Sequence, residues 1–434
     1  MTPFARPALN EGVRKREVFA WAMYDFANSG YTTVVLTAVF NAYFVGVVAG
    51  HARWATLAWT AALAASSAIV MATMPVLGAW ADLRGAKKRL LALTTAGCVV
   101  ATALLARVGP GDVALGVAAV VVSNVFYSYG ESLCAAFLPE LARRDALGRV
   151  SGWGWSFGYV GGMLTLGLSL AYVVAAQARG EGAAQFVPVT MLVTAAVYAL
   201  AALPTFALLR ERARPQAGGR AAGARAAFAR LWQTWRVARR YRDFAWLMAC
   251  SVAYQAGIAV VIALAAVYAE QVLAFRQTQT MLLVFLVNIA SAAGAFGFGY
   301  AQDRIGHRRA LALTLVGWIV MTLLAMAATG PALFWAAAVV AGLCMGSSQS
   351  AGRALAGLFA PPPRLAEFYG LWTFAVRLAA ICGPLTYGAV TFATGGNHRI
   401  AIGVTGLFFV AGLLLLARVD VRRGIAAAAA GAAG

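Results

Sequence analysis

Twelve long apolar stretches constrain the fold of this 434-residue chain more than any other feature. A helix of about 20 mostly apolar residues spans the hydrocarbon core of a bilayer, so each stretch predicts one membrane-spanning helix. The runs are continuous and rich in Ala, Leu and Val, which favours helices over the alternating pattern of a membrane β-barrel. The predicted spans are residues 19–45, 55–80, 89–107, 112–136, 150–176, 186–209, 244–269, 279–301, 309–329, 331–352, 366–393 and 399–418.

The composition agrees with an all-α membrane protein. Apolar residues make up 62% of the chain and charged residues 12%, whereas soluble domains average about 45–50% apolar and about 25% charged residues. This excludes a soluble multidomain protein, which would lack polar surface, and a disordered chain. Residues 1–18 carry no apolar run, so we expect no cleavable signal peptide.

A polar segment with ten Arg residues, 210–243, divides the spans into two sets of six. We predict an N-terminal bundle (1–209), a cytoplasmic basic linker (210–243), and a C-terminal bundle with a short cytoplasmic tail (244–434). Residues 228–240 have the pattern of a basic amphipathic helix, which predicts contact with anionic lipid at the inner face. We expect the Ala-rich tail after Arg423 to be unstructured.

The distribution of positive charge predicts the orientation. If residues 1–18 lie inside, 28 of the 35 Lys and Arg residues fall on the inner side and five on the outer side. Cytoplasmic loops carry this excess, so we predict a multi-pass protein of the bacterial cytoplasmic membrane with both termini cytoplasmic. The bias is spread over every inner loop, so the net charge of +20 does not require a nucleic-acid partner.

The sequence offers little for catalysis. Five Cys residues occur singly and three His residues lie far apart, so we predict neither a disulfide framework nor a metal site, and no cofactor. No Ser-His-Asp set or phosphate-binding loop lies near a bilayer face. We therefore expect a protein that is not an enzyme.

One loop motif occurs at the same place in each set of six spans. Gly78 precedes Asp82 by four residues and Gly85 follows it by three; the same spacing recurs 221 residues later around Asp303, with Gly306 after it. We predict that the small glycines let a neighbouring helix approach and that each Asp caps or pairs with an adjacent helix end. Further predicted gating residues are Arg84, Arg304, Arg308 and Arg353.

This doubled motif resembles the inner-loop signature of the major facilitator superfamily. The resemblance implies two six-helix bundles around a midplane cavity that opens alternately to each side of the membrane. Other segments resemble the vacuole-effluxer-like branch, whose bacterial members are often called the unknown major facilitator family. These segments are residues 21–44 (opening Trp21-Ala-Met-Tyr24-Asp25), 137–141, 151–162 (opening Ser151-Gly-Trp-Gly-Trp) and 346–384.

The resemblance implies a substrate class, because fungal relatives export amino acids from the vacuole. The chain also departs from the family pattern. Family members typically carry an acid in the seventh span, where this chain has Ala256, and Tyr-Asn in the fourth, where it has Cys134 and Ala135. Proton coupling, if present, must therefore use another carboxylate.

Ionisable residues within spans are the first candidates for solute or proton binding, because a charge inside a bilayer is costly. Asp25 shares a helical face with Asn28 and Ser29, which could bond its charged form, so we rank it first as a proton site. Its alternative role is to cap the inner end of the helix. Glu131, on the face of Tyr127, ranks second and could instead pair with a base.

Arginine and amide side chains complete the predicted site. Arg377 and Arg353 can each bind a carboxylate through two parallel hydrogen bonds; alternatively they pair with Glu367 or Asp303 at the inner gate. The amides could instead bond between helices. The remaining candidates for solute contact are Tyr24, Gln255, Asn288 and Gln349.

In the fifth span, small-residue spacing predicts close helix packing at Gly154, Gly158 and Gly162. We interpret Trp153 and Trp155 as interface anchors. Taken with the spans and motifs, these features predict a monomeric secondary transporter that moves a small solute by alternating access, in the efflux direction and with proton coupling. The alternative is a receptor or scaffold that has the same fold but no transport activity.

Overall fold

The computed structural model describes residues 8–216, 241–273, 275 and 277–431, with isolated positions at 226, 229 and 232. Within these residues, twelve helical segments are long and apolar enough to cross a membrane, which confirms the predicted number of spans. The amphipathic helix expected at 228–240 lies outside the described residues, apart from two isolated positions.

The first six spans end close to their predicted bounds. The first span combines α1 (Lys15–Tyr31), the π-helical η1 (Thr32–Ala38), α2 (Phe40–Tyr43) and the π-helical η2 (Phe44–Val48). The other five are α3 (Ala55–Arg84), α4 (Lys87–Leu104), α5 (Val113–Ala135), α7 (Leu147–Ala178) and α8 (Ala183–Leu208). Between them lie the short η3 (Leu105–Arg107), α6 (Leu138–Leu141) and η4 (Arg144–Ala146).

The last six spans form the second half. They are α10 (Arg242–Leu273), α11 (Gln277–Ile305), α12 (His307–Ala327), α13 (Pro331–Phe359), α14 (Leu365–Ala393) and α15 (His398–Leu416), with the short η7 (Pro362–Arg364) before α14. A further helix, α16 (Val421–Ala430), follows.

The expectation of an unstructured tail is wrong. The Asp420 side chain caps α16 by accepting a hydrogen bond from the Arg423 N–H at 3.0 Å, and Ala has the highest helix propensity. The Arg423 guanidinium also donates to both carboxylate oxygens of Asp243, each at 2.6 Å. A cap, a good helix former and an ion pair together fix this segment against α10.

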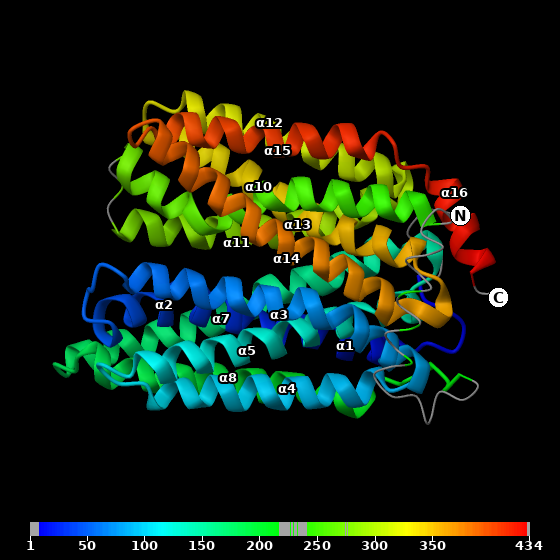
Figure 1. Ribbon diagram of the computed structural model, residues 1–434, viewed down its shortest axis with the longest axis horizontal. Coiled ribbons are helices and arrows are strands. Elements are labelled where there is room, and N and C mark those ends of the chain that lie inside the picture. The colour runs from blue at the N-terminus through cyan, green and yellow to red at the C-terminus, as the bar shows by residue number, and fades with distance from the viewer. Residues whose placement is uncertain are drawn as a thin grey trace.

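The helices form two bundles that lie side by side, and both termini lie at the same end of the molecule (Figure 1). One bundle contains α1–α8 and the other α10–α15. They meet mainly where α3 packs on α14 and where α7 packs on α11. The two pairings are equivalent in the two halves, as an internal repeat requires.

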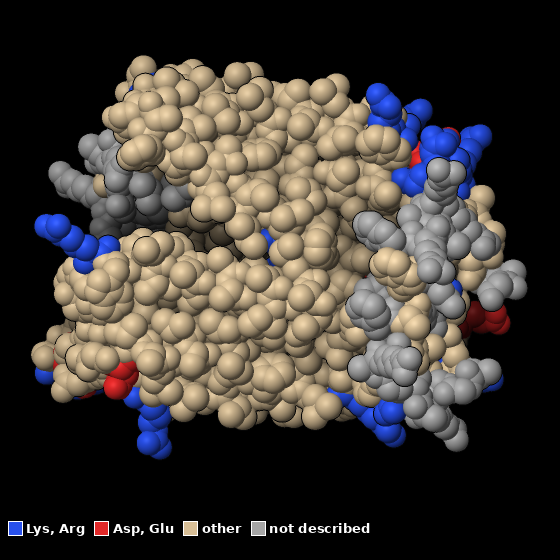
Figure 2. Space-filling model, viewed as in Figure 1, with Lys and Arg blue, Asp and Glu red and all other residues tan. Residues whose placement is uncertain are grey.

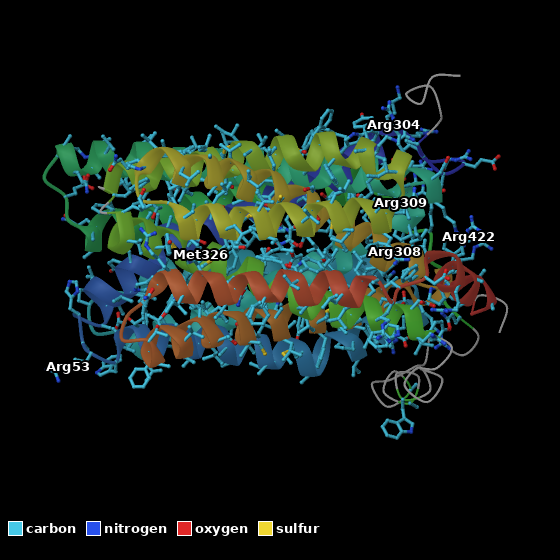
Figure 3. All side chains as sticks on the ribbon, turned by 90° about the horizontal axis from the view of Figure 1, so that it is seen from above. Arg53, Arg304, Arg308, Arg309, Met326 and Arg422 are labelled. Atoms are coloured by element: carbon cyan, nitrogen blue, oxygen red, sulfur yellow. The ribbon has the colours of Figure 1, made fainter. Side chains whose placement is uncertain are left out.

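The surface distinguishes the two ends of the molecule. On the face in Figure 2, the middle carries few charged side chains, Lys and Arg gather at the end with the termini, and the surface is hollowed between the bundles toward the opposite end. Figure 3 places Arg53 at that opposite end. At the end with the termini it places Arg304, Arg308, Arg309 and Arg422.

Candidate functional site

The first repeated loop caps a helix of the other half. The buried Asp82 carboxylate, near the end of α3, accepts hydrogen bonds from the N–H groups of Ala366 (3.1 Å) and Glu367 (2.9 Å) at the start of α14. N–H groups in the first turn of a helix have no partner within that helix. A carboxylate satisfies them and interacts favourably with the helix dipole.

The second loop repeats this contact in the opposite sense. The Asp303 carboxylate, in α11 of the second half, accepts from the N–H groups of Gly148 (2.9 Å) and Arg149 (3.1 Å) at the start of α7. It also accepts from the Arg149 Nε at 2.9 Å. Both aspartates therefore cap an adjacent helix, as the motif predicts, and each contact crosses between the halves.

The glycines of the loops permit these contacts. A side chain at Gly78 would collide with the main-chain carbonyl of Ala366, so the predicted close approach is present. Gly85 ends α3 with φ of +58°, and Gly306 precedes α12 with φ of +91°, conformations that residues with a side chain rarely adopt.

The basic residues of the loops have different surroundings. The Arg84 guanidinium lies 4.7 Å from the Trp80 ring centroid. The Arg308 guanidinium donates to the Ala417 carbonyl at 3.0 Å. Arg304 lies at the end with the termini (Figure 3). The gating role of these residues stays a prediction.

Arg353 joins three helices in the interior. Its Nη1 donates to the Asp25 carboxylate at 2.6 Å, its Nη2 to the Ser151 carbonyl at 2.7 Å and its Nε to the Ser151 hydroxyl at 3.1 Å. The guanidinium also faces the rings of Trp21 and Trp155, at 4.7 and 5.3 Å from their centroids. Arg353 thus connects α13 of the second half to α1 and α7 of the first.

A second ion pair crosses the halves between α5 and α14. The Arg377 Nη2 donates to the Glu131 carboxylate at 2.8 Å, and the guanidinium lies 5.9 Å from the Tyr127 ring centroid. The buried Arg377 Nε has no hydrogen-bond partner. A buried N–H donor without a partner is uncommon in a folded interior. The Arg377 Nε could therefore donate one further hydrogen bond, to a ligand.

The two pairs differ in access. The side chains of Arg353 and Asp25 are 4% and 11% exposed, whereas those of Arg377 and Glu131 are 14% and 27% exposed. The alternative partners considered from sequence, Glu367 and Asp303, are wrong for both arginines. In the first pair every guanidinium nitrogen is bonded, whereas in the second the Arg377 Nε has no partner.

The match of residues 55–429 to the family described as "Vacuole effluxer Atg22 like" decides the classification. The chain belongs to this Atg22-like family. It is a multi-pass transporter of the major facilitator superfamily and not an enzyme. Within the described part of the chain, no three His, Cys, Asp or Glu side chains group as a metal site would require.

Relatives of this Atg22-like chain include bacterial and fungal proteins. It is 25% identical over 410 residues to the "Uncharacterized MFS-type transporter YxiO" of Bacillus subtilis (strain 168), covering 92% of this chain and 93% of the relative. It is 25% identical over 201 residues to "Autophagy-related protein 22-2" of Aspergillus oryzae, covering 43% of this chain and 32% of the relative.

Solved structures of transporters share the fold. The human organic anion transporter MFSD10 (TETRAN) superposes with a TM-score of 0.75 at 16% identity, covering 93% of this chain and 99% of that one. The transporter FucP, in an outward conformation, gives a TM-score of 0.72 at 12% identity, covering 93% and 98%. These similarities confirm two six-helix bundles of the major facilitator fold.

Two expectations about the first span of this Atg22-like protein need correction. The Ser29 hydroxyl donates to the main-chain carbonyl of Asp25 at 2.7 Å, and Asn28 accepts a weak bond from Ser29 at 3.5 Å, so neither supports the Asp25 carboxylate. Tyr24 is fully buried, and its hydroxyl bonds to those of Thr95 (3.1 Å) and Tyr198 (3.2 Å) within the first bundle. The prediction of Tyr24 as a solute contact is therefore wrong for this state.

The amide candidates bond within the second half. Gln255 donates to Gln349 at 2.7 Å, and the Asn288 amide donates to the Val284 carbonyl of its own helix at 2.8 Å. The alternative interpretation, bonding between helices, holds for Gln255 and Gln349. All three stay candidates for solute contact when the bundle rearranges.

The fifth span contributes more than the sequence indicated. Trp155 faces the interior Arg353, so its interpretation as an interface anchor is wrong. The Trp153 indole N–H donates to the Tyr300 hydroxyl at 3.3 Å, and its anchoring role stays a prediction. The three spaced glycines of α7 do face α1 at close range, as predicted. Ser151 and Arg149 were missed, because a serine and a basic residue at the start of a span carry no distinctive signal.

Proposed function

We propose that this Atg22-like protein is a secondary active transporter that exports a small zwitterionic solute, an amino acid or a related metabolite, by alternating access. The observation that carries the proposal is the partly exposed Glu131–Arg377 pair within the spans, which joins the two halves. The family description as an effluxer supports the direction of transport.

A zwitterion suits this pair because it supplies a partner for both charges. Its carboxylate would bind Arg377, whose Nε is free to donate and whose planar fork matches a carboxylate. Its ammonium group would bind Glu131. A solute with a single charge would leave one partner buried without a counter-ion, which is costly.

Alternating access would act through the contacts that cross the halves. The Asp82 and Asp303 caps hold the bundles together at the end with the termini, while the hollow in Figure 2 opens toward the other end. Opening the first end requires both caps to break. A solute that bridges Glu131 and Arg377 would keep these charges paired while the halves move.

Glu131 is the better candidate for proton coupling. Its side chain is more exposed than that of Asp25, so it is the more accessible of the two to a proton. Protonated Glu131 could not pair with the solute ammonium, so proton and solute would compete for this site, which would couple solute export to proton entry. This reverses the order inferred from sequence, where Asp25 ranked first.

We further propose that the chain resides as a monomer in a bacterial cytoplasmic membrane, with both termini cytoplasmic and the basic linker against anionic lipid. The net charge of +20 and the basic residues gathered at the end with the termini support this orientation (Figure 2).

Flux into proteoliposomes with an imposed pH gradient tests the proposed function. The wild-type protein should accumulate a labelled neutral amino acid, and Glu131→Gln should lose gradient-driven accumulation and keep solute exchange only at higher solute concentration, because the ammonium group loses its counter-ion. Glu181→Gln, which removes a carboxylate from the exposed Arg179 pair, is the matched control. Thermal stabilisation should occur with amino acids but not with their decarboxylated analogues.

The alternative, a receptor or scaffold with this fold, predicts binding without flux. Solute-dependent stabilisation combined with no accumulation and no exchange would favour that alternative. Equal stabilisation by decarboxylated analogues would contradict the zwitterion.

A further inference from the structure

A cavity of about 490 Å³ lies at the end of the molecule that carries the termini, apart from the two ion pairs within the spans. Its volume falls within the range of small-molecule sites. It is bounded by Asp82, Pro139, Glu140, Ala142, Arg144, Leu147, residues 212–214, Gln216, Gly357, Leu358, Ala360, Pro362, Pro363 and Leu365.

Three parts of the chain build this cavity: the first half, the second half and the start of the linker. The linker is tied to both halves, because the Gln216 main-chain N–H donates to the Leu83 carbonyl at 3.0 Å and its side chain donates to the Pro363 carbonyl at 2.8 Å. The wall residue Arg212 is held by Glu17 at 2.9 Å. The cavity therefore exists only while the halves are together at this end.

The charges of the wall favour an anion. Asp82 is satisfied by the N–H groups of α14 and Glu140 pairs with the buried Lys87. Arg144 and Arg214 are exposed and form no ion pair with any described residue. Two guanidinium groups are thus available at one cavity, and guanidinium binds phosphate in a bidentate geometry.

The wall also holds an unused acceptor. The Oε2 atom of Glu140 is buried and has no hydrogen-bond partner in the described structure. A buried carboxylate oxygen without a partner is costly. A ligand with both a phosphate and hydroxyl donors would satisfy the two arginines and this oxygen together.

We propose that this cavity binds a phosphate group carried on a hydroxylated small molecule or lipid headgroup, and that the ligand stabilises the state in which the end with the termini is closed. The walls separate when the halves separate, so the ligand binds the closed state more tightly and shifts the population toward it. The site would thus act as a brake on transport that responds to a phosphate-bearing molecule.

The binding claim is tested on the full-length protein with sn-glycerol 3-phosphate as the soluble probe and with nanodiscs of phosphatidylcholine with or without phosphatidylglycerol. We expect the melting temperature to rise with the soluble probe, with phosphatidylglycerol, or with both, which identifies the source of the phosphate. The Arg144→Gln/Arg214→Gln variant should lose at least tenfold in affinity.

The matched control is Arg143→Gln, which removes a neighbouring exposed arginine that pairs with Asp145 and does not line the cavity. No stabilisation by either probe would overturn the proposal. Equal loss in the control and in the double variant would also overturn it, because the effect would then be general attraction to a basic surface.

The claim about state is tested by spin labels at Arg89 and Arg309, exposed residues at the starts of α4 and α12. The probe that stabilises the wild-type protein should increase the short-distance population between the labels, and the double variant should not respond. Binding with an unchanged distance distribution would overturn the brake. Neither measurement depends on the solute. The proposed brake can therefore be overturned while the proposed transport function stands, and the transport function can be overturned while the brake stands.

Discussion

At the scale of single residues, Arg353 is held on all sides, since Asp25 and Ser151 use its guanidinium nitrogens and two indole rings face it. Arg353→Gln leaves the Asp25 carboxylate buried without a counter-ion. Removing one partner of a buried pair costs about 3–5 kcal/mol, so we expect a large drop in melting temperature.

The Asp25→Asn/Arg353→Gln double variant should recover part of this loss, because no unpaired charge remains. Thermal unfolding of the four proteins of the cycle measures the coupling. Strictly additive losses would contradict the inference that the pair acts as one unit.

Tyr24 gives a second prediction at this scale. Its hydroxyl bonds to Thr95 and Tyr198 inside the first bundle. Tyr24→Phe should therefore cost about 1 kcal/mol of stability and leave solute affinity unchanged, as measured by thermal unfolding with and without solute. If the free energy of solute binding fell by more than the free energy of unfolding, Tyr24 would contact the solute after all.

The sequence was sufficient to identify the types of residue in the site and insufficient to identify their partners. A charged residue within a span is costly and therefore marks a candidate site at any position. This is how the sequence identifies Asp25, Glu131, Arg353 and Arg377. Their pairing joins positions 328 and 246 residues apart, and one sequence contains no information on contacts at that range. Helical spacing placed Ser29 beside Asp25, but its hydroxyl bonds to the main chain.

At the scale of elements, prediction was accurate where length and hydrophobicity decide the outcome. Twelve apolar stretches became twelve spans, because the bilayer thickness sets a minimum length. The π-helical segments Thr32–Ala38 and Phe44–Val48 were not predicted, since the same apolar composition is compatible with an α-helix and with a π-helix. The helix α16 was not predicted, since the Asp243 side chain that anchors it lies 180 residues away from Arg423 in the sequence.

The capping contacts carry the prediction at this scale. Asp82→Asn removes the charge from the α14 cap, and Asp303→Asn removes it from the α7 cap together with the Arg149 ion pair. An amide has one acceptor oxygen where the carboxylate uses two, so each variant should weaken the closed end by about 1 kcal/mol or more. Asp303→Asn should have the larger effect.

Transport rates of both variants should fall while solute affinity stays within about twofold of wild type, because the caps lie away from Glu131 and Arg377. Asp145→Asn, on the exposed Arg143 pair, is the control and should transport normally. If folded Asp82→Asn or Asp303→Asn protein failed to bind solute, the caps would not be gates.

At the scale of the whole molecule, the repeat explains why the two halves hold each other. Each half contributes one aspartate and receives one helix start, so neither cap forms within a single half. The fold could be inferred from the doubled motif, because the repeat unit of six spans fixes the bundle count. The end at which the hollow opens could not be inferred from the sequence, because the same sequence adopts both the inward-open and the outward-open state of a transport cycle.

The orientation of the molecule gives the last prediction. Arg53 and Arg422 lie at opposite ends (Figure 3), and both are accessible enough to carry a cysteine without disturbing the core. The described native cysteines are buried except Cys382, which is partly exposed, so Cys382→Ser provides the background. In intact cells an impermeant thiol reagent should label Arg53→Cys at once and Arg422→Cys only after the membrane is permeabilised, because the excess of positive charge belongs on the cytoplasmic side. Labelling of Arg422→Cys in intact cells would invert the orientation, and the capped, closed end would then face outward.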